Sequence, residues 1–372
     1  MDKLNENIIH LYNKWKEGYV RKETALEEKI KPMREWAEKV FEPEQFDIMD
    51  FDISGISVNG DLNIYLQGGL KMIIKELAYP FIECTGSIDI AGLKSLKNFP
   101  KYVKYDFDCS RCDDLTTLKG APENVGGYFD CRHCDSLTSL EGAPKKVGDS
   151  FNCRECPSLT SLKGASENVG GDFNCYGCTS LTSLDGAPKT VNGEFYCHGC
   201  YSLLSLEGAP EKVNGSFFCR HCPSLTSLEG APEEVKGDFV CNCCPSLTSL
   251  EGAPEEVSSF YCNNCDNLTS LKGAPKKVGK YFNCSWCKNI TSLVGAPEEV
   301  GEDFYCDNCE NLISLKGAPK EVVSDFYCNG CKNLKSIKDL PKIIGGDLYI
   351  DKKFEGKIPD DVTIGGEILW KN

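Results

Sequence analysis

The sequence predicts a repeat solenoid made mainly of β-strands, and three observations lead to this fold class: a fixed period, a recurring cysteine pair and a recurring turn. A C-x-x-C pair occurs eleven times, and its first cysteine recurs every 22 residues, with one 21-residue step. Such periods are typical of solenoids, in which each unit buries its apolar face against its neighbours. We expect about fifteen stacked short parallel strands with a turn-rich convex side, preceded by an N-terminal α-helical cap.

The repeating unit can be written V-x-G-x-F-x-C-x-x-C-x-x-L-T-S-L-x-G-A-P-x-x. F-x-C alternates between inward and outward positions, which favours a short strand stacked about 4.8 Å from its copies. G-A-P interrupts any helical run, so we expect extended chain and turns on the opposite side. The 21-residue step is a one-residue loss in EEVSSFYC, which places the irregularity between Val and Phe.

Degenerate units extend the stack at both ends. VNGDLNI (58–64), GSIDI (86–90) and IGGDLYI (344–350) carry Ile64, Ile90 and Ile350 in the slot of the first cysteine, and IGGEILW (364–370) carries Trp370 there. End rungs of solenoids are expected to be atypical because they seal the core.

A different segment precedes the stack. Apolar residues follow helical spacing up to Gly18, and Thr24-x-x-Glu27 resembles a capping box that opens a second helix running to about Phe41, which Pro32 should kink or split. We expect a helical cap on the first rung, with an independent docking module as the alternative. The predicted divisions are a helical segment (1–45), degenerate capping repeats (46–108), eleven full repeats (109–338) and C-terminal capping repeats (339–372).

Within one unit, Phe129, Cys131, Cys134, Leu137 and Leu140 occupy the slots of L-x-L-x-x-N-x-x-L-x-x-L. This pattern resembles the leucine-rich-repeat family, in a short form similar to cysteine-punctuated repeats of bacteria and their phages. The resemblance covers nearly everything after residue 55 and implies a binding scaffold with no particular partner. The G-A-P turn departs from longer repeats of the family, which carry a helix there.

The amino-acid composition limits the kinds of function that this protein can have. With 372 residues, 41% apolar and 26% charged, the chain is long and apolar enough to fold around a substantial core. Its formal charge of −15 repels nucleic acid and anionic membranes. The N-terminus lacks a signal-peptide pattern and no run of 18 apolar residues occurs, so we expect a cytoplasmic protein whose 24 cysteines stay reduced.

The C-x-x-C pairs match the spacing of zinc sites, but three features favour buried thiols. A tetrahedral zinc site uses two C-x-x-C pairs, whereas the chain has eleven pairs, so one pair would be left over. Isoleucine replaces the first cysteine in end rungs. The 22 residues of one repeat also form a complete rung, in which the cysteines serve as small apolar core residues. Zinc binding and disulfides within rungs remain as alternatives, and Cys243, in CNCC, is the expected exposed thiol.

The two residues inside each C-x-x-C are expected to point outward at the exit of the strand. Seven of the ten Arg and His residues fall in these positions, whereas none of the 35 Lys residues does. In these positions, planar side chains that can form bidentate hydrogen bonds or stack on rings are therefore preferred over lysine.

The residue between Phe and the first cysteine begins as Asp or Asn and becomes aromatic along the chain. Tyr, Trp and Arg dominate binding hot spots, so we expect a concave surface that binds an elongated partner. The predicted partner-binding residues are Arg111, Arg132, His133, Arg154, Tyr176, Tyr196, His198, Phe218, Arg220, His221, Tyr261, Trp286, Tyr305 and Tyr327.

The sequence thus favours a non-catalytic scaffold that binds a protein, with no cofactor and no metal. A zinc protein using the C-x-x-C ladder is the first alternative, and single-stranded nucleic-acid binding by the Arg and aromatic positions is the second, which the acidic balance disfavours. Neither a phosphate-binding loop nor a nucleophile elbow occurs, so we expect no enzyme activity. Neither the oligomeric state nor the identity of the partner follows from the sequence.

Overall fold

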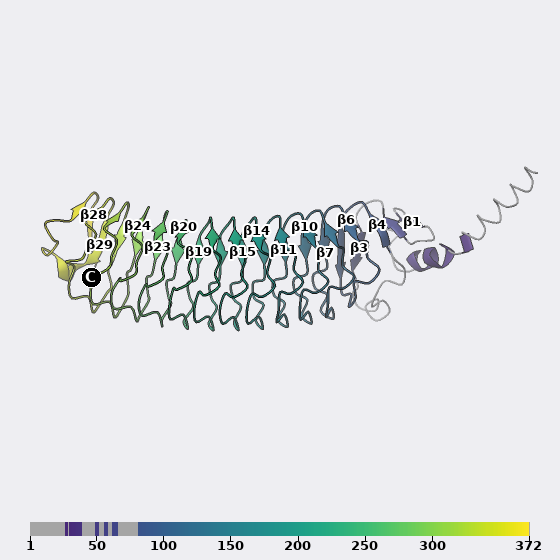
Figure 1. The fold of residues 1–372 in the computed structure, drawn as a ribbon, viewed down its shortest axis with the longest axis horizontal. Helices are drawn as coiled ribbons and strands as arrows, with labels where there is room; N and C mark the ends of the chain where they lie inside the picture. Colours follow the sequence, from purple (N-terminus) through teal and green to yellow (C-terminus); the bar gives the residue numbers. More distant parts are fainter. Residues whose placement is uncertain are drawn as a thin grey trace, which may run out of the picture.

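The chain winds as a parallel β-solenoid that runs almost straight along its length (Figure 1). The computed structural model describes residues 27–28, 30–38, 49–51, 56–58, 62–65 and 81–371. Each turn of the coil is one repeat, and its backbone is held mainly by hydrogen bonds to the turns before and after it.

One parallel sheet contains the strands that begin at the repeated Phe, and it has 15 strands. Phe151, for example, lies opposite Phe129 on one side and Phe173 on the other. The expected stack of about fifteen short strands is therefore confirmed. The strands are β3 (Leu62–Tyr65), β5 (Ile88–Ala91), β7 (Phe107–Asp108), β9 (Phe129–Asp130), β11 (Phe151–Asn152), β13 (Phe173–Asn174), β15 (Phe195–Tyr196), β17 (Phe217–Phe218), β19 (Phe239–Val240), β21 (Phe260–Tyr261), β23 (Phe282–Asn283), β25 (Phe304–Tyr305), β27 (Phe326–Tyr327), β29 (Leu348–Asp351) and β31 (Ile368–Lys371).

The degenerate units form the end rungs of this sheet. Ile64 lies opposite Ile90, and Ile350 lies opposite Trp370. Ile90 and Ile350 are fully buried, as the cysteines of the inner rungs are. Isoleucine thus fills the same core column as the first cysteine.

A second set of short strands, which was not anticipated from the sequence, ends at the repeated Val in the full repeats. Two residues are too few to show an alternating pattern, so extended chain and turns were expected there without a second sheet. Cys84 lies opposite Val103, which places this lone cysteine in the Val column. The strands are β1 (Met49–Phe51), β2 (Ile56–Val58), β4 (Phe81–Cys84), β6 (Tyr102–Val103), β8 (Asn124–Val125), β10 (Lys146–Val147), β12 (Asn168–Val169), β14 (Thr190–Val191), β16 (Lys212–Val213), β18 (Glu234–Val235), β20 (Glu256–Val257), β22 (Lys277–Val278), β24 (Glu299–Val300), β26 (Glu321–Val322), β28 (Ile343–Ile344) and β30 (Thr363–Ile364).

The 21-residue step breaks this second set. The ladder stops at β18 and resumes at β20 as a separate sheet, while β19 and β21 stay paired. One residue is missing between Val257 and Phe260, compared with Val235 and Phe239. The irregularity therefore lies at the turn between Val and Phe, as predicted.

The core is built from columns of identical side chains. Rings of consecutive Phe residues stack with centroids 5.0 Å apart for Phe129 and Phe151 and 5.8 Å apart for Phe260 and Phe282. The two cysteines of each full repeat are buried beside them, together with two leucines or, in two repeats, a leucine and an isoleucine. The leucine-to-Val side of each full repeat forms turns without a helix in the described chain, as expected.

Little of the described chain is helical. Residues 30–38 form a helix, and Lys352–Phe354 form one 3-10 turn, η1, near the last rung. The first predicted helix and the boundary near residue 45 lie outside the described residues.

Candidate functional site

The outer surface of the 15-stranded sheet, here called the strand face, carries three columns of side chains. The corner column is the residue before each Phe, the middle column is the residue after it, and the turn column is the pair between the cysteines. All fourteen predicted partner-binding residues lie in the middle and turn columns, and none of them is buried. Because the coil is nearly straight (Figure 1), this surface is not a pronounced concave face.

The turn column has a backbone feature that sequence reasoning missed. The second residue of all eleven pairs adopts a positive φ, between 53° at His221 and 71° at Gly330. Asn and Gly adopt this left-handed conformation readily, whereas other residues pay about 1–2 kcal/mol for it. The column nevertheless holds Arg111, His133, Glu155, His221, Cys243 and Trp286. These six side chains are therefore kept despite a local backbone cost.

The middle column holds this turn in place where it carries Asp or Asn. The side chain of Asp130 accepts a hydrogen bond from the Arg132 backbone N–H at 2.9 Å, and Asn174 does the same for Tyr176 at 3.0 Å. Such Asx turns stabilise tight loops. The Asp and Asn residues at the start of this column thus support the fold.

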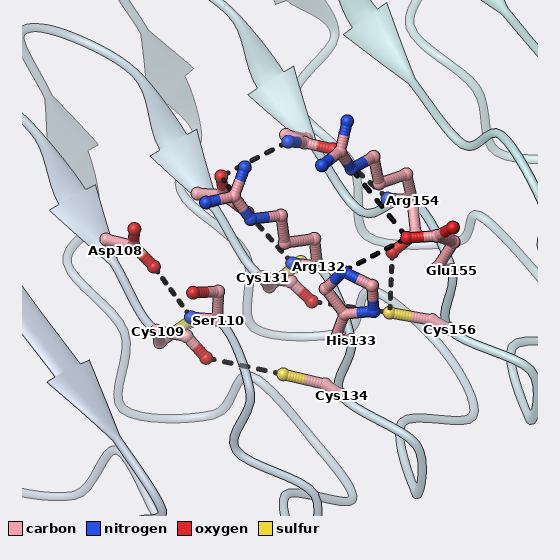
Figure 2. A network of polar contacts seen from close by, with 12 residues as sticks. Asp108, Cys109, Ser110, Cys131, Arg132, His133, Cys134, Arg154, Glu155 and Cys156 are labelled. Carbon is pink, nitrogen blue, oxygen red and sulfur yellow. Dashed lines mark hydrogen bonds and ion pairs between the residues drawn. The ribbon is translucent and has the colours of Figure 1, made fainter. Parts of the chain in front are cut away.

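Charged groups form a network in the first half of the strand face (Figure 2). Arg132 Nε lies 3.5 Å from Asp130 Oδ2, and Arg154 Nε lies 3.9 Å from Glu155 Oε2. His133 Nε2 lies 3.0 Å from the same carboxylate. Burial raises the pKa of Asp130, while the Arg132 N–H and guanidinium and the Asn152 amide partly offset that effect. Arg132 and Arg154 are thus partly neutralised within the protein.

The aromatic residues stack on one another along the coil. Tyr327 stacks on Tyr305 with ring centroids 4.4 Å apart, and on Tyr349 at 4.1 Å. Tyr196 stacks on Phe218 at 5.0 Å. The stacked rings thus form two aromatic ribs on the strand face, one of Tyr196 and Phe218 and the other of Tyr305, Tyr327 and Tyr349.

The corner column supplies carboxylates to those ribs. The hydroxyl of Tyr305 donates to Asp303 at 2.7 Å, and that of Tyr196 donates to Glu194. Burial and the adjacent carboxylates raise the pKa of both phenols. Trp286, by contrast, lies in the turn column and is 49% exposed.

A depression of about 510 Å³ opens in the turn column near the middle of the coil. His198 stacks on Tyr176 at 4.3 Å, and its Nδ1 is buried without a hydrogen-bond partner. Burial, with the nearby Arg220 and His221, lowers the pKa of His198 to about 4, so its ring is neutral at pH 7. The depression is lined by Tyr176, His198, Gly199, Tyr201, Arg220, His221, Pro223, Cys243 and Pro245.

The cysteines form a ladder of thiols beneath this surface. In successive rungs the second cysteine donates its S–H to the backbone carbonyl of the first cysteine one rung earlier, as Cys178 does to Cys153 at 3.2 Å and Cys287 to Cys262 at 3.1 Å. None of the 24 cysteines forms a disulfide, and Cys243 alone among them is not buried. Cys243, the expected exposed thiol, is therefore partly exposed.

Burial raises the pKa of Cys112 and of Cys244 to about 12, which keeps these two thiols protonated at neutral pH. No group of three or more potential metal ligands occurs among the residues that the structure describes.

In the described part of the chain, no helix combines the length and the hydrophobicity that crossing a membrane requires. Comparison of the chain with protein-family models, with curated proteins and with solved structures found no match in any of the three.

Proposed function

We propose that this chain is a non-catalytic scaffold that binds an elongated protein partner along its strand face. The observation that carries the proposal is the turn column, where six side chains other than Gly and Asn occupy left-handed backbone. Backbone strain of this kind persists where surrounding structure or function demands it. A purely structural turn is satisfied by Gly or Asn, as Gly330 and Asn308 illustrate.

The distribution of charge and aromatic rings supports the same surface. Arg111 and Arg220 are exposed and form no ion pair with any described residue, so each can bind a partner's carboxylate. Trp286 adds an exposed aromatic anchor of the type found in hot spots.

We assign the solenoid to the leucine-rich-repeat type, in a short form with cysteine in the Asn slot. Asn in that slot bonds to backbone leaving the strand, and the thiol of Cys178 makes the equivalent contact with the Cys153 carbonyl. The proposal includes a cytoplasmic location and an N-terminal helical cap, since thiols require a reducing environment and solenoid ends require a seal.

The thiol ladder favours this reading over a zinc protein. A cysteine that donates to a carbonyl carries its proton, whereas zinc requires the thiolate. The second cysteine of each pair also points at backbone one rung away. Elemental analysis of protein purified without chelator tests the alternative, which needs several equivalents of zinc per chain.

Affinity capture with charge variants tests the scaffold proposal. Arg111, Arg154 and Arg220 are changed together to Gln, leaving Arg132 to neutralise Asp130. The matched control changes three surface lysines, Lys189, Lys212 and Lys236, to Gln. We expect the first variant to keep its circular dichroism spectrum and lose the partner, and the control to retain it. Equal recovery by the two variants would contradict the choice of surface.

A further inference from the structure

The middle of the strand face is free of acidic residues in two of its three columns. Across the six rungs from β13 to β23, no middle-column or turn-column position is Asp or Glu. The nearest acids in these columns are Glu155 on one side and Asp307 on the other. In a chain with a net charge of −15, such a window is a local departure from the overall field.

Arg220 and His221, which lie inside this window, differ from Arg132 and Arg154 outside it. Arg132 and Arg154 have carboxylates within 4 Å on the same face, at Asp130 and Glu155. Arg220 and His221 are exposed and have no such partner among the described residues. Their hydrogen-bond donors are therefore available to an external acceptor.

Two glycines interrupt the turn column beside them, and one of these, Gly199, lines the depression. Gly177 and Gly199 take the left-handed position that Glu155 and His221 take in the flanking rungs. The column of side chains is thus interrupted for two rungs, a gap of about 10 Å at 4.8 Å per rung. The ring of Tyr176 lies over Gly199, 3.0 Å from where a β-carbon would stand.

The floor and walls of the gap combine flat and polar groups. Tyr176 and His198 stack at 4.3 Å, and Tyr201, which also lines the depression, is 58% exposed. Arg220 also lines the depression, and the buried Nδ1 of His198 lacks a partner. A stacked ring pair next to an unpaired guanidinium suits an acidic group carried on a short apolar stem.

We infer that this depression binds an Asp or Glu side chain of the partner protein, with its carboxylate on the Arg220 guanidinium and its stem against Tyr176 and His198. The inference rests on the proposed function and names the chemistry of one contact within it. The corner column supplies carboxylates such as Glu194 and Asp238 along the same rungs, so extended polyanions are repelled and a single carboxylate is accommodated.

Histidine-ring NMR tests this inference directly. The chain has four histidines, and His133, His198 and His221 report on the network and the depression separately. The probe is an acetylated, amidated octapeptide with a single Glu among Val and Ser residues, and the matched peptide replaces that Glu with Gln. We expect saturable shifts of the His198 and His221 signals with the Glu peptide, an unmoved His133 signal, and no shifts with the Gln peptide.

Two variants locate the contact. Arg220→Gln should weaken binding of the Glu peptide roughly tenfold or more, the usual scale for losing a charged hydrogen-bond partner. Gly199→Asn introduces a residue that tolerates the left-handed backbone, as Asn264 does. Its side chain should fill the gap and also weaken binding of the Glu peptide. Lys189→Gln is the control, since Lys189 is exposed but lies outside the strand face.

Several outcomes would overturn the inference. These are equal binding of the two peptides, full affinity in Arg220→Gln, shifts confined to His133, or no shift at any histidine. The capture experiment with the charge variants stands apart from this test. Its success together with a failed peptide titration would retain the scaffold and discard the carboxylate site.

Discussion

The thiol of Cys134 donates a hydrogen bond to the backbone carbonyl of Cys109, 3.3 Å away in the preceding rung. The same contact recurs along the coil, as between Cys331 and Cys306 at 3.2 Å. Each second cysteine therefore fills core space and satisfies a backbone acceptor of its neighbour. One small residue performs both tasks, which explains why a spacing known from metal sites can recur in a packed core.

The Phe column should dominate stability. Phe217 is fully buried and stacks on Phe195 with centroids 5.2 Å apart. Phe217→Ala should lower the free energy of unfolding by about 3–5 kcal/mol. Phe217→Leu should cost less than half of that, because Leu348 occupies the same column in an end rung. Urea denaturation measures both, and an Ala variant as stable as the Leu variant would contradict the packing account.

The buried carboxylate of Asp130 should cost stability at neutral pH. Burial raises its pKa in the folded state, so the folded chain binds the proton more tightly than the unfolded chain does. Stability then falls as the pH rises through the window above the unfolded value of 3.8. Asp130→Asn should be more stable at pH 7 and lose that advantage in acid, since Asn152 makes the same turn contact. Denaturation at pH 7 and pH 3.5 checks the sign, and a destabilised Asn variant at pH 7 would refute it.

His198 should make the protein acid-sensitive in a second window. Its folded pKa of about 4 lies below its ordinary value of 6.5. Between these values the unfolded chain binds a proton that the folded chain does not, so stability falls as the pH is lowered from 6.5 to 4. His198→Asn, with the residue that Asn242 places in the same column, should flatten this dependence. An unchanged pH profile would show that the ring is not desolvated.

Replacing Trp286 by Gly should stabilise the left-handed turn at this position. Trp286 has a φ of 62°, and Gly relieves that strain while adding freedom to the unfolded chain. Trp286→Gly should therefore raise the free energy of unfolding by up to about 1 kcal/mol. Thermal denaturation compares it with Trp286→Ala, which keeps the strain and should show no gain. A large loss in the Gly variant would mean that the indole is needed for the fold.

The period and the core columns could be predicted because every repeat restates them. Ile90 and Ile350 occupy the column of the first cysteine. An apolar replacement at that position indicates that the cysteines of this column pack in the core. The Val strands could not be predicted, since two residues such as Lys146–Val147 carry no alternation. Their pairing arises only when neighbouring turns are stacked in register.

The turn geometry was hidden for a different reason. Gly177, Gly199, Gly330, Asn264 and Asn308 share one position, and that concentration of Gly and Asn is a signal for left-handed backbone. Arg and His in the same column drew the interpretation toward binding alone. The ion pairs of Figure 2 depend on side-chain conformations that spacing does not specify.

Native mass spectrometry after alkylation, without chelator, tests the central claim that sulfur fills space in this protein. Folded protein treated with iodoacetamide should carry one modification, at Cys243, with the mass of the metal-free chain and the other 23 thiols reduced and reactive only after unfolding. Bound zinc, paired loss of hydrogens from disulfides, or several alkylated cysteines in the folded state would contradict it.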